Sequence, residues 1–175
     1  NTVTGEITTS TSSPGTYTVT YTTAGTCTDT SSVEVTIYAL DDASFSYLRL
    51  SYCISDTDPI PTRTATQTII GGTFTSTSGL TFTSSSTGII DLSASTPGTY
   101  TVTYTTAGNC PQSSSVTITI NDLDDASFSY AKAAYCVNES DPSAVITGIT
   151  SGTFSSLSGL VFTDTSSGTI DLDGS

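Results

Sequence analysis

The fold is decided by the stretch Gly-Thr-Tyr-Thr-Val-Thr-Tyr-Thr at residues 98–105. Its apolar residues Tyr100, Val102 and Tyr104 alternate with Thr. A period of two is typical of a strand that places one face on a core and the other face in water. A turn residue, Pro97, comes directly before the stretch. The sequence therefore predicts a half-buried strand that begins at a tight turn and exposes its Thr side chains.

A second alternating stretch follows the turn residues 107–111 and places Val116, Ile118 and Ile120 on one face. Helix signals are nearly absent, because Gly or Pro recurs at short intervals and no long run has a period of 3.6 residues. The Pro-Gly-Thr-Tyr sequence at 97–100 resembles the tyrosine corner of Ig-like domains, in which a Tyr hydroxyl bonds to nearby backbone. We predict an all-β fold, an Ig-like β-sandwich with strands at 43–50, 61–68, 72–76, 80–84, 89–93, 99–106 and 114–120.

The sequence repeats with a period of 83 residues. The stretch Asp-Asp-Ala-Ser-Phe-Ser-Tyr at 41–47 returns unchanged at 124–130, and Tyr-Thr-Thr-Ala-Gly-Thr-Cys at 21–27 returns with one change at 104–110. A fixed period of this kind indicates a tandem array of similar domains. We therefore divide the chain into the C-terminal half of one Ig-like repeat (1–40), a complete repeat (41–123) and the N-terminal part of the next repeat (124–175). We expect the chain to be one portion of a longer tandem array.

The composition excludes several classes of function. The chain contains 39 Thr and 30 Ser but no His, and three basic residues face sixteen acidic ones, for a formal charge of -13. Phosphate groups and anionic lipids need clustered Lys and Arg, so we expect no nucleic-acid partner. The chain contains no run of about 18 apolar residues, so we expect no direct membrane insertion. Without His, the common catalytic triads and His-ligated zinc sites cannot form, and we expect no catalytic residue, no enzyme activity and no organic cofactor.

The ordered motifs of the repeat resemble those of very large surface adhesins of Bacteroidetes, including the SprB-type gliding-motility adhesin. The resemblance covers the whole chain. The motifs that carry it are Ala-Ser-Phe-Ser-Tyr (43–47), Tyr-Cys (52–53), Gly-Gly-Thr-Phe (71–74), Ile-Asp-Leu (90–92) and the stretch 97–110. It implies an extended Ig-like array, export by the type IX secretion system and attachment to the outer membrane, hence an extracellular, cell-surface location.

Four cysteines suggest disulfide bonds, because small extracellular domains are commonly held together in this way. Our leading prediction pairs Cys53 with Cys110 inside the complete repeat and leaves Cys27 and Cys136 to partners outside the chain. A closed loop of this length would stabilise the domain by about 4 kcal/mol. Two alternatives stay open: a bond from Cys53 to the turn of the next repeat that corresponds to residues 107–111, and four free thiols.

The acidic residues cluster near the expected junction between repeats. Calcium binds six to eight oxygen ligands, so a group of carboxylates is a candidate site for the ion. The candidate calcium ligands are Asp56, Asp58, Asp122, Asp124 and Asp125. The alternative interpretation is that these acids cap turns and keep the chain soluble.

Two functions from different classes fit these observations. The leading hypothesis is a non-catalytic, adhesive repeat that forms the stalk of a secreted cell-surface adhesin. Its partners would be the neighbouring repeats of the same chain and an extracellular polysaccharide or a solid surface. The alternative is an Ig-like module that binds glycan or a surface polymer, which requires exposed aromatic side chains in its loops. An accessory domain of a hydrolase fits least, because no catalytic set is present.

Overall fold

The computed structural model describes residues 4–63 and 71–175, which form strands, turns and a single short 3-10 helix. The chain divides into two compact units, Asn1–Asn121 and Asp122–Ser175. The all-β prediction is confirmed. No helix among the described residues is long and apolar enough to cross a membrane. The elements are η1 (Thr9–Thr11), β1 (Gly15–Thr22), β2 (Thr30–Ile37), β3 (Phe45–Ser46), β4 (Ser51–Cys53), β5 (Thr62–Arg63), β6 (Thr73–Ser76), β7 (Thr81–Ser84), β8 (Ile89–Asp91), β9 (Gly98–Thr105), β10 (Ser113–Asn121), β11 (Phe128–Ser129), β12 (Val145–Ile146), β13 (Val161–Asp164) and β14 (Thr169–Asp171).

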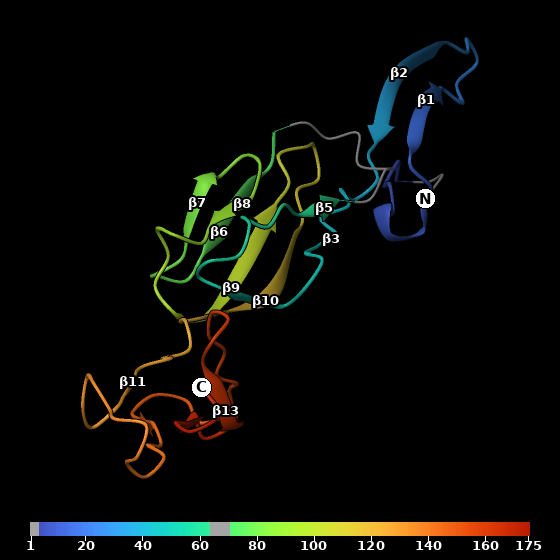
Figure 1. Cartoon of the computed structure of the whole chain (residues 1–175). Coiled ribbons are helices and arrows are strands. Elements are labelled where there is room, and N and C mark those ends of the chain that lie inside the picture. The colour runs from blue at the N-terminus through green and yellow to red at the C-terminus, as the bar shows by residue number, and fades with distance from the viewer. Residues whose placement is uncertain (1–3, 64–70) are drawn as a thin grey trace. The chain divides into compact units, whose positions relative to one another are not determined.

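Strands β9 and β10 form the central hairpin of residues 41–121, which we call the sandwich (Figure 1). They pair antiparallel, with Gly98 opposite Ile120 at one end. Tyr100, Val102 and Tyr104 are only 6%, 0% and 1% exposed. The alternation predicted from the sequence is therefore confirmed, since these three side chains enter the core while the Thr residues between them are more exposed.

The sandwich has two layers around one core. The first is a four-stranded sheet in the order β4-β10-β9-β6, in which β4 runs parallel to β10 and the other neighbours are antiparallel. The second consists of the pairs β3–β5 and β7–β8, and the N–H of Ile90 on β8 donates to the carbonyl of Pro59, 3.2 Å away. The rings of Phe45 and Phe74, one from each layer, meet edge to face with centroids 5.2 Å apart.

The structure corrects the strand predicted at 43–50: within that range only β3, Phe45–Ser46, is a strand, and β4 begins after it at Ser51, in the other layer. Strand β3 pairs with β5, and after a turn the chain continues as β4 alongside β10. Tyr47 and Tyr52 are 5% and 4% exposed, so both enter the core. They are five positions apart in the sequence, and residues at an odd spacing face opposite sides of a continuous strand. The chain buries both only by changing layers. Most of the strand predicted at 61–68 lies outside the described residues.

The tyrosine corner predicted before β9 is present. The hydroxyl of Tyr100 donates to the carbonyl of Thr96 at 2.6 Å. The same bond forms in the preceding repeat, where the hydroxyl of Tyr17 donates to the carbonyl of Ser13 at 2.8 Å. Each bond spans four residues and fixes the direction in which the chain enters the hairpin.

Tyr47 makes the stability of the sandwich sensitive to alkaline pH. Its hydroxyl donates to the carbonyl of Gly88 at 2.6 Å. Burial, and to a lesser extent the neighbouring Tyr52, raises the pKa of Tyr47. An unfolded Tyr ionises near pH 10, so this contribution to stability is fully present below about pH 10 and declines as the pH rises further.

We therefore expect the free energy of unfolding, measured with urea from pH 8 to 11, to fall above pH 10. Tyr47→Phe should reduce that slope, and at pH 8 it should cost about 0.5–1.5 kcal/mol for the lost hydrogen bond. Tyr21→Phe is the matched control, because Tyr21 is 72% exposed. Equal pH slopes in the Tyr47→Phe variant and the original chain would contradict the assignment.

Candidate functional site

Asp58 joins the loop after β4 to the end of β8. Its Oδ1 accepts a hydrogen bond from the N–H of Leu92 at 2.9 Å. Leu92 is fully buried, so its backbone donor would otherwise lack a partner in the core. The same bond forms in the next repeat, where the N–H of Leu172 donates to Asp141 Oδ1 at 3.0 Å. The Asp at this position is therefore a structural acceptor in both repeats.

Asp56 follows β4 and bonds to residues before it and at its end. Its Oδ2 lies 3.1 Å from the guanidinium of Arg49 and accepts the N–H of Cys53 at 2.9 Å. The guanidinium also lies over the ring of Tyr52, 4.8 Å from the centroid. This ion pair was not predicted from the sequence, because Arg49 and Asp56 lie on either side of β4 and meet only when the chain turns.

The next repeat keeps the same turn with a different pair of charges. Lys132 and Glu139 stand where Arg49 and Asp56 stand, and their side chains are 2.6 Å apart. The hydrogen bond between them raises the pKa of Lys132 and lowers that of Glu139. Lys132 is shorter than Arg49, and Glu139 is longer than Asp56. The two side chains of each pair together therefore span a similar distance. Both pairs lie at the surface, where solvent screens the attraction, so they contribute little to the stability of the fold.

Two linker acids bond to nearby backbone. Asp125 Oδ1 accepts the N–H of Ser127 at 2.9 Å, and the bond with Ser127 lowers the pKa of Asp125. Asp122 Oδ1 accepts the N–H of Leu123 at 2.9 Å. These are local turn contacts of the kind that Asp commonly makes.

The structure does not assemble the predicted calcium ligands into one group. Among residues 4–63 and 71–175, no three His, Cys, Asp or Glu side chains lie close enough together to hold a metal ion. Four of the five candidates accept hydrogen bonds from protein donors: Asp56, Asp58, Asp122 and Asp125. The calcium site, including Asp124, stays a prediction.

The four cysteines are free thiols. Cys53 lies opposite Asn121 at the last residue of β10, whereas Cys110 precedes the first residue of that strand, Ser113. Eight residue steps at about 3.3 Å place these ends roughly 26 Å apart. A disulfide needs Cα atoms about 4.4–6.8 Å apart, so the leading prediction, a bond from Cys53 to Cys110, does not fit this sheet. Bonds from Cys27 and Cys136 to partners elsewhere stay predictions.

Asp41 fastens the first residues of the sandwich to the turn before β10. Its N–H donates to the carbonyl of Cys110 at 3.0 Å, and its Oδ2 accepts the hydroxyl of Thr106 at 2.8 Å and the N–H of Gly108 at 3.0 Å. A Cβ at Gly108 would lie 2.5 Å from that carboxylate oxygen, so a larger residue would displace the Asp41 side chain from this position. The role of Asp41 was not predicted from the sequence, although its recurrence as Asp124 is a signal that could have indicated it.

The opposite end of β10 is fastened to β4. The N–H of Ile54 donates to the carbonyl of Asn121 at 3.0 Å. The side-chain amide of Asn121 donates to Ser51 Oγ at 2.8 Å and to the carbonyl of Tyr52 at 3.2 Å. The chain therefore enters the sandwich beside the start of β10 and leaves it at the end of the same strand.

No protein-family model matches the chain, and no curated protein matches it. Several solved structures are similar in part, and three of them are extracellular regions of protocadherins. Extracellular cadherin domains 3–6 of protocadherin gamma B2 align with 14% identity and a TM-score of 0.39, over 89% of this chain and 47% of that one. Domains 1–5 of the same protein align with 16% identity and a TM-score of 0.35, over 89% of this chain and 38% of that one. The extracellular domain of protocadherin gamma B4 aligns with 13% identity and a TM-score of 0.35, over 89% of this chain and 32% of that one. The chain thus spans less than half the length of these structures.

The roles of the acids can be separated by a pair of substitutions. We expect Asp58→Ala to lower the free energy of unfolding by about 1–3 kcal/mol in the presence of EDTA, because the buried N–H of Leu92 loses its acceptor. Asp122→Ala is the matched control and should change it by less than about 0.5 kcal/mol, as an exposed substitution. Urea unfolding measures both.

A calcium site formed by both acids would give another pattern. The ion would then raise the melting temperature above the value in NaCl of equal ionic strength, and each substitution would remove that increment. Equal stability of the two variants in EDTA would contradict the structural role of Asp58.

Proposed function

We propose that the chain is a non-catalytic, adhesive repeat that forms part of the extended stalk of a secreted cell-surface adhesin. One observation carries the proposal: the chain enters and leaves the sandwich at opposite ends of one strand. Asp41 is tied to Cys110 before β10, and Asn121 ends that strand. A domain built in this way adds length whenever it is repeated.

The core of the sandwich supports this arrangement, because it is complete within one repeat. Its buried cluster is drawn from residues 43–120 alone. A repeat that buries its own apolar side chains needs no neighbour for its core, so repeats can be joined in series. Along β10, each adds roughly 26 Å at about 3.3 Å per residue.

The geometry also suits a domain that carries tension. Strand β4 near the beginning and strand β10 at the end are hydrogen-bonded and parallel. When the two ends are pulled apart, these strands slide in opposite directions along their length. The bonds between them are then loaded together, and they include Leu50 with Thr119 at 2.8 Å and Ile54 with Asn121 at 3.0 Å.

The finer assignment is to the giant surface adhesins of Bacteroidetes, of which the SprB-type gliding-motility adhesin is one. The ordered motifs of the repeat support this assignment. The assignment implies type IX secretion, outer-membrane attachment and an extracellular location. The partners in this proposal are neighbouring repeats and an extracellular polysaccharide or solid surface. The glycan-binding alternative has less support, because Tyr47, Tyr52, Phe74, Tyr100 and Tyr104 of the sandwich are buried.

Stretching single molecules of the whole chain by its two ends tests the load-bearing role. We expect a distinct force peak that releases the chain between Asp41 and Asn121, a gain of about 25 nm at 3.3–3.6 Å per residue after the folded length is subtracted. Asn121→Ala should lower the peak force without changing the gain, because it removes two side-chain bonds to β4. Asn109→Ala in the turn before β10 is the control. Featureless extension would contradict the proposal.

A further inference from the structure

The outward side of the sheet β4-β10-β9-β6 is covered by hydroxyl groups. Successive residues of a strand point to opposite sides of a sheet, and Phe74, Val102 and Ile118 point into the core. The residues that alternate with them along 73–75, 99–105 and 113–119 are all Ser or Thr. We call these outward residues the hydroxyl face. None of the four strands of the sheet contains a charged residue, so this face is neutral.

The register of the strands aligns the hydroxyl groups in rows. Thr103 lies between Thr75 on one neighbouring strand and Ser115 on the other. In the next row, Thr101 lies opposite Thr117. Neighbouring strands are about 4.8 Å apart, and alternate residues of one strand are about 6.7 Å apart. The hydroxyl face is therefore a regular grid of small polar groups.

The hydroxyl groups keep hydrogen-bonding capacity for a partner. Thr103 and Ser115 share a hydrogen bond at 2.8 Å, and each such bond uses only one of the two hydroxyl protons. The hydroxyl groups of Thr101 and Thr117 make no hydrogen bond within the described part of the chain, although both side chains are exposed. The face therefore offers donors and acceptors together, at short intervals.

The cations of the chain do not suit this face to an anionic polymer. Arg49 is paired with Asp56, and Lys132 is paired with Glu139. Arg63 donates to the hydroxyl of Tyr104 at 3.3 Å, and Tyr104 lies on the core side of β9. With a net charge of -13, the chain repels an anionic polymer and offers it no cation on the hydroxyl face. A partner of this face is therefore uncharged.

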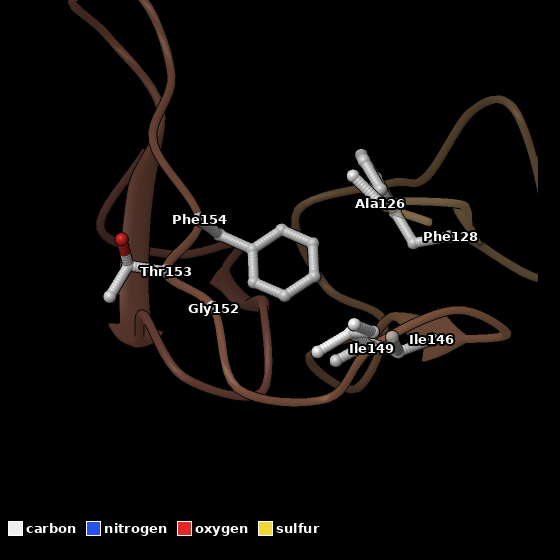
Figure 2. Close-up of a pocket in the computed structure, with 7 residues that line it drawn as sticks. All are labelled: Ala126, Phe128, Ile146, Ile149, Gly152, Thr153 and Phe154. Atoms are coloured by element: carbon white, nitrogen blue, oxygen red, sulfur yellow. The ribbon is translucent and has the colours of Figure 1, made fainter. Parts of the chain in front are cut away.

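The apolar pocket of about 160 Å³ in the C-terminal segment has the opposite chemistry. Figure 2 shows the ring of Phe154 pointing into a space lined by Ala126 and Ile149, with the hydroxyl of Thr153 directed away from the ring. Such a lining offers few hydrogen-bonding groups to a hydroxyl-rich ligand. The hydroxyl face supplies these groups in numbers.

We infer that the hydroxyl face contacts a neutral, extended polysaccharide. The inference deepens the adhesive role proposed above and rests on it. An uncharged sugar polymer carries donors and acceptors at close intervals, as the hydroxyl face does. Its contacts replace hydrogen bonds to water with hydrogen bonds to sugar, so each one is weak. The contact needs no aromatic side chain in a loop, which distinguishes it from the alternative glycan-binding module.

Repetition makes weak contacts effective. The hairpin of the preceding repeat has the same kind of hydroxyl pairs, Thr16 with Thr36 at 3.0 Å and Thr20 with Ser32 at 2.7 Å. A polymer that is held by one hydroxyl face meets another at a high effective concentration. Affinity for the polysaccharide therefore grows with the number of repeats, although each face binds weakly.

Affinity electrophoresis of the whole chain in native gels tests the inference. The gels contain hydroxyethylcellulose or galactomannan, which are neutral, or alginate, which is anionic. We expect the neutral polymers to slow the chain in proportion to their concentration and alginate to have no effect. Thr101→Val/Thr117→Val should weaken the retardation about threefold, because it removes two free hydroxyls and keeps the branched shape of the side chains. Thr101→Ser/Thr117→Ser, which keeps the hydroxyls, should behave as the original chain.

Thr57→Val/Thr62→Val is the matched control, since both residues are exposed and lie outside the hydroxyl face. Equal retardation of the two Val variants, or retardation by alginate alone, overturns the inference. A chain that neither neutral polymer slows also overturns it, and adsorption of that chain to silica beads would assign the face to a solid surface. The stretching measurement is independent of this one. A force peak without retardation would leave the load-bearing role and remove the polysaccharide contact.

Discussion

The structure depends on one contact surface, the apolar face of the hairpin β9–β10. Strands β4 and β6 exist as strands only because this hairpin supplies their partners, and Tyr104 covers Phe74 from it. The four-stranded sheet β4-β10-β9-β6 forms only where this hairpin is present among the described residues. Residues 134–136 and 153–156, which correspond to β4 and β6, form no strand.

The contacts at the two ends of β10 place the beginning and the end of the domain at opposite ends of this strand. Asp41 binds the turn at one end of the strand, and Asn121 with Ile54 binds β4 at the other. Both rely on backbone groups, so their geometry tolerates much variation in the side chains around them. The turn held by Arg49 and Asp56 shows such variation directly, since Lys132 and Glu139 form the same contact with the lengths of the two side chains exchanged. This turn is therefore kept although the residues that hold it differ between the two repeats.

The sequence predicted the elements whose information is local. The Tyr and Val alternation of β9, the Val and Ile alternation of β10 and the corner at Tyr100 all depend on residues within a few positions of one another. Features that depend on distant partners were missed. The change of layer between Tyr47 and Tyr52 depends on two sheets, and the acceptor role of Asp58 depends on Leu92, 34 positions away. The bond from Cys53 to Cys110 did not fit because β4 is parallel to β10, a pairing that no local pattern encodes.

The outward face of the central hairpin has a chemical consequence. Its hydroxyl groups bond to one another across the strands, Thr103 with Ser115 at 2.8 Å and Thr105 with Ser113 at 2.9 Å. Neither β9 nor β10 contains a charged residue. The flank of the sandwich is thus wetted by neutral groups that do not titrate over the ordinary pH range. This face of the sandwich therefore keeps the same charge when the pH of the surroundings changes, because a hydroxyl group neither gains nor loses a proton in that range.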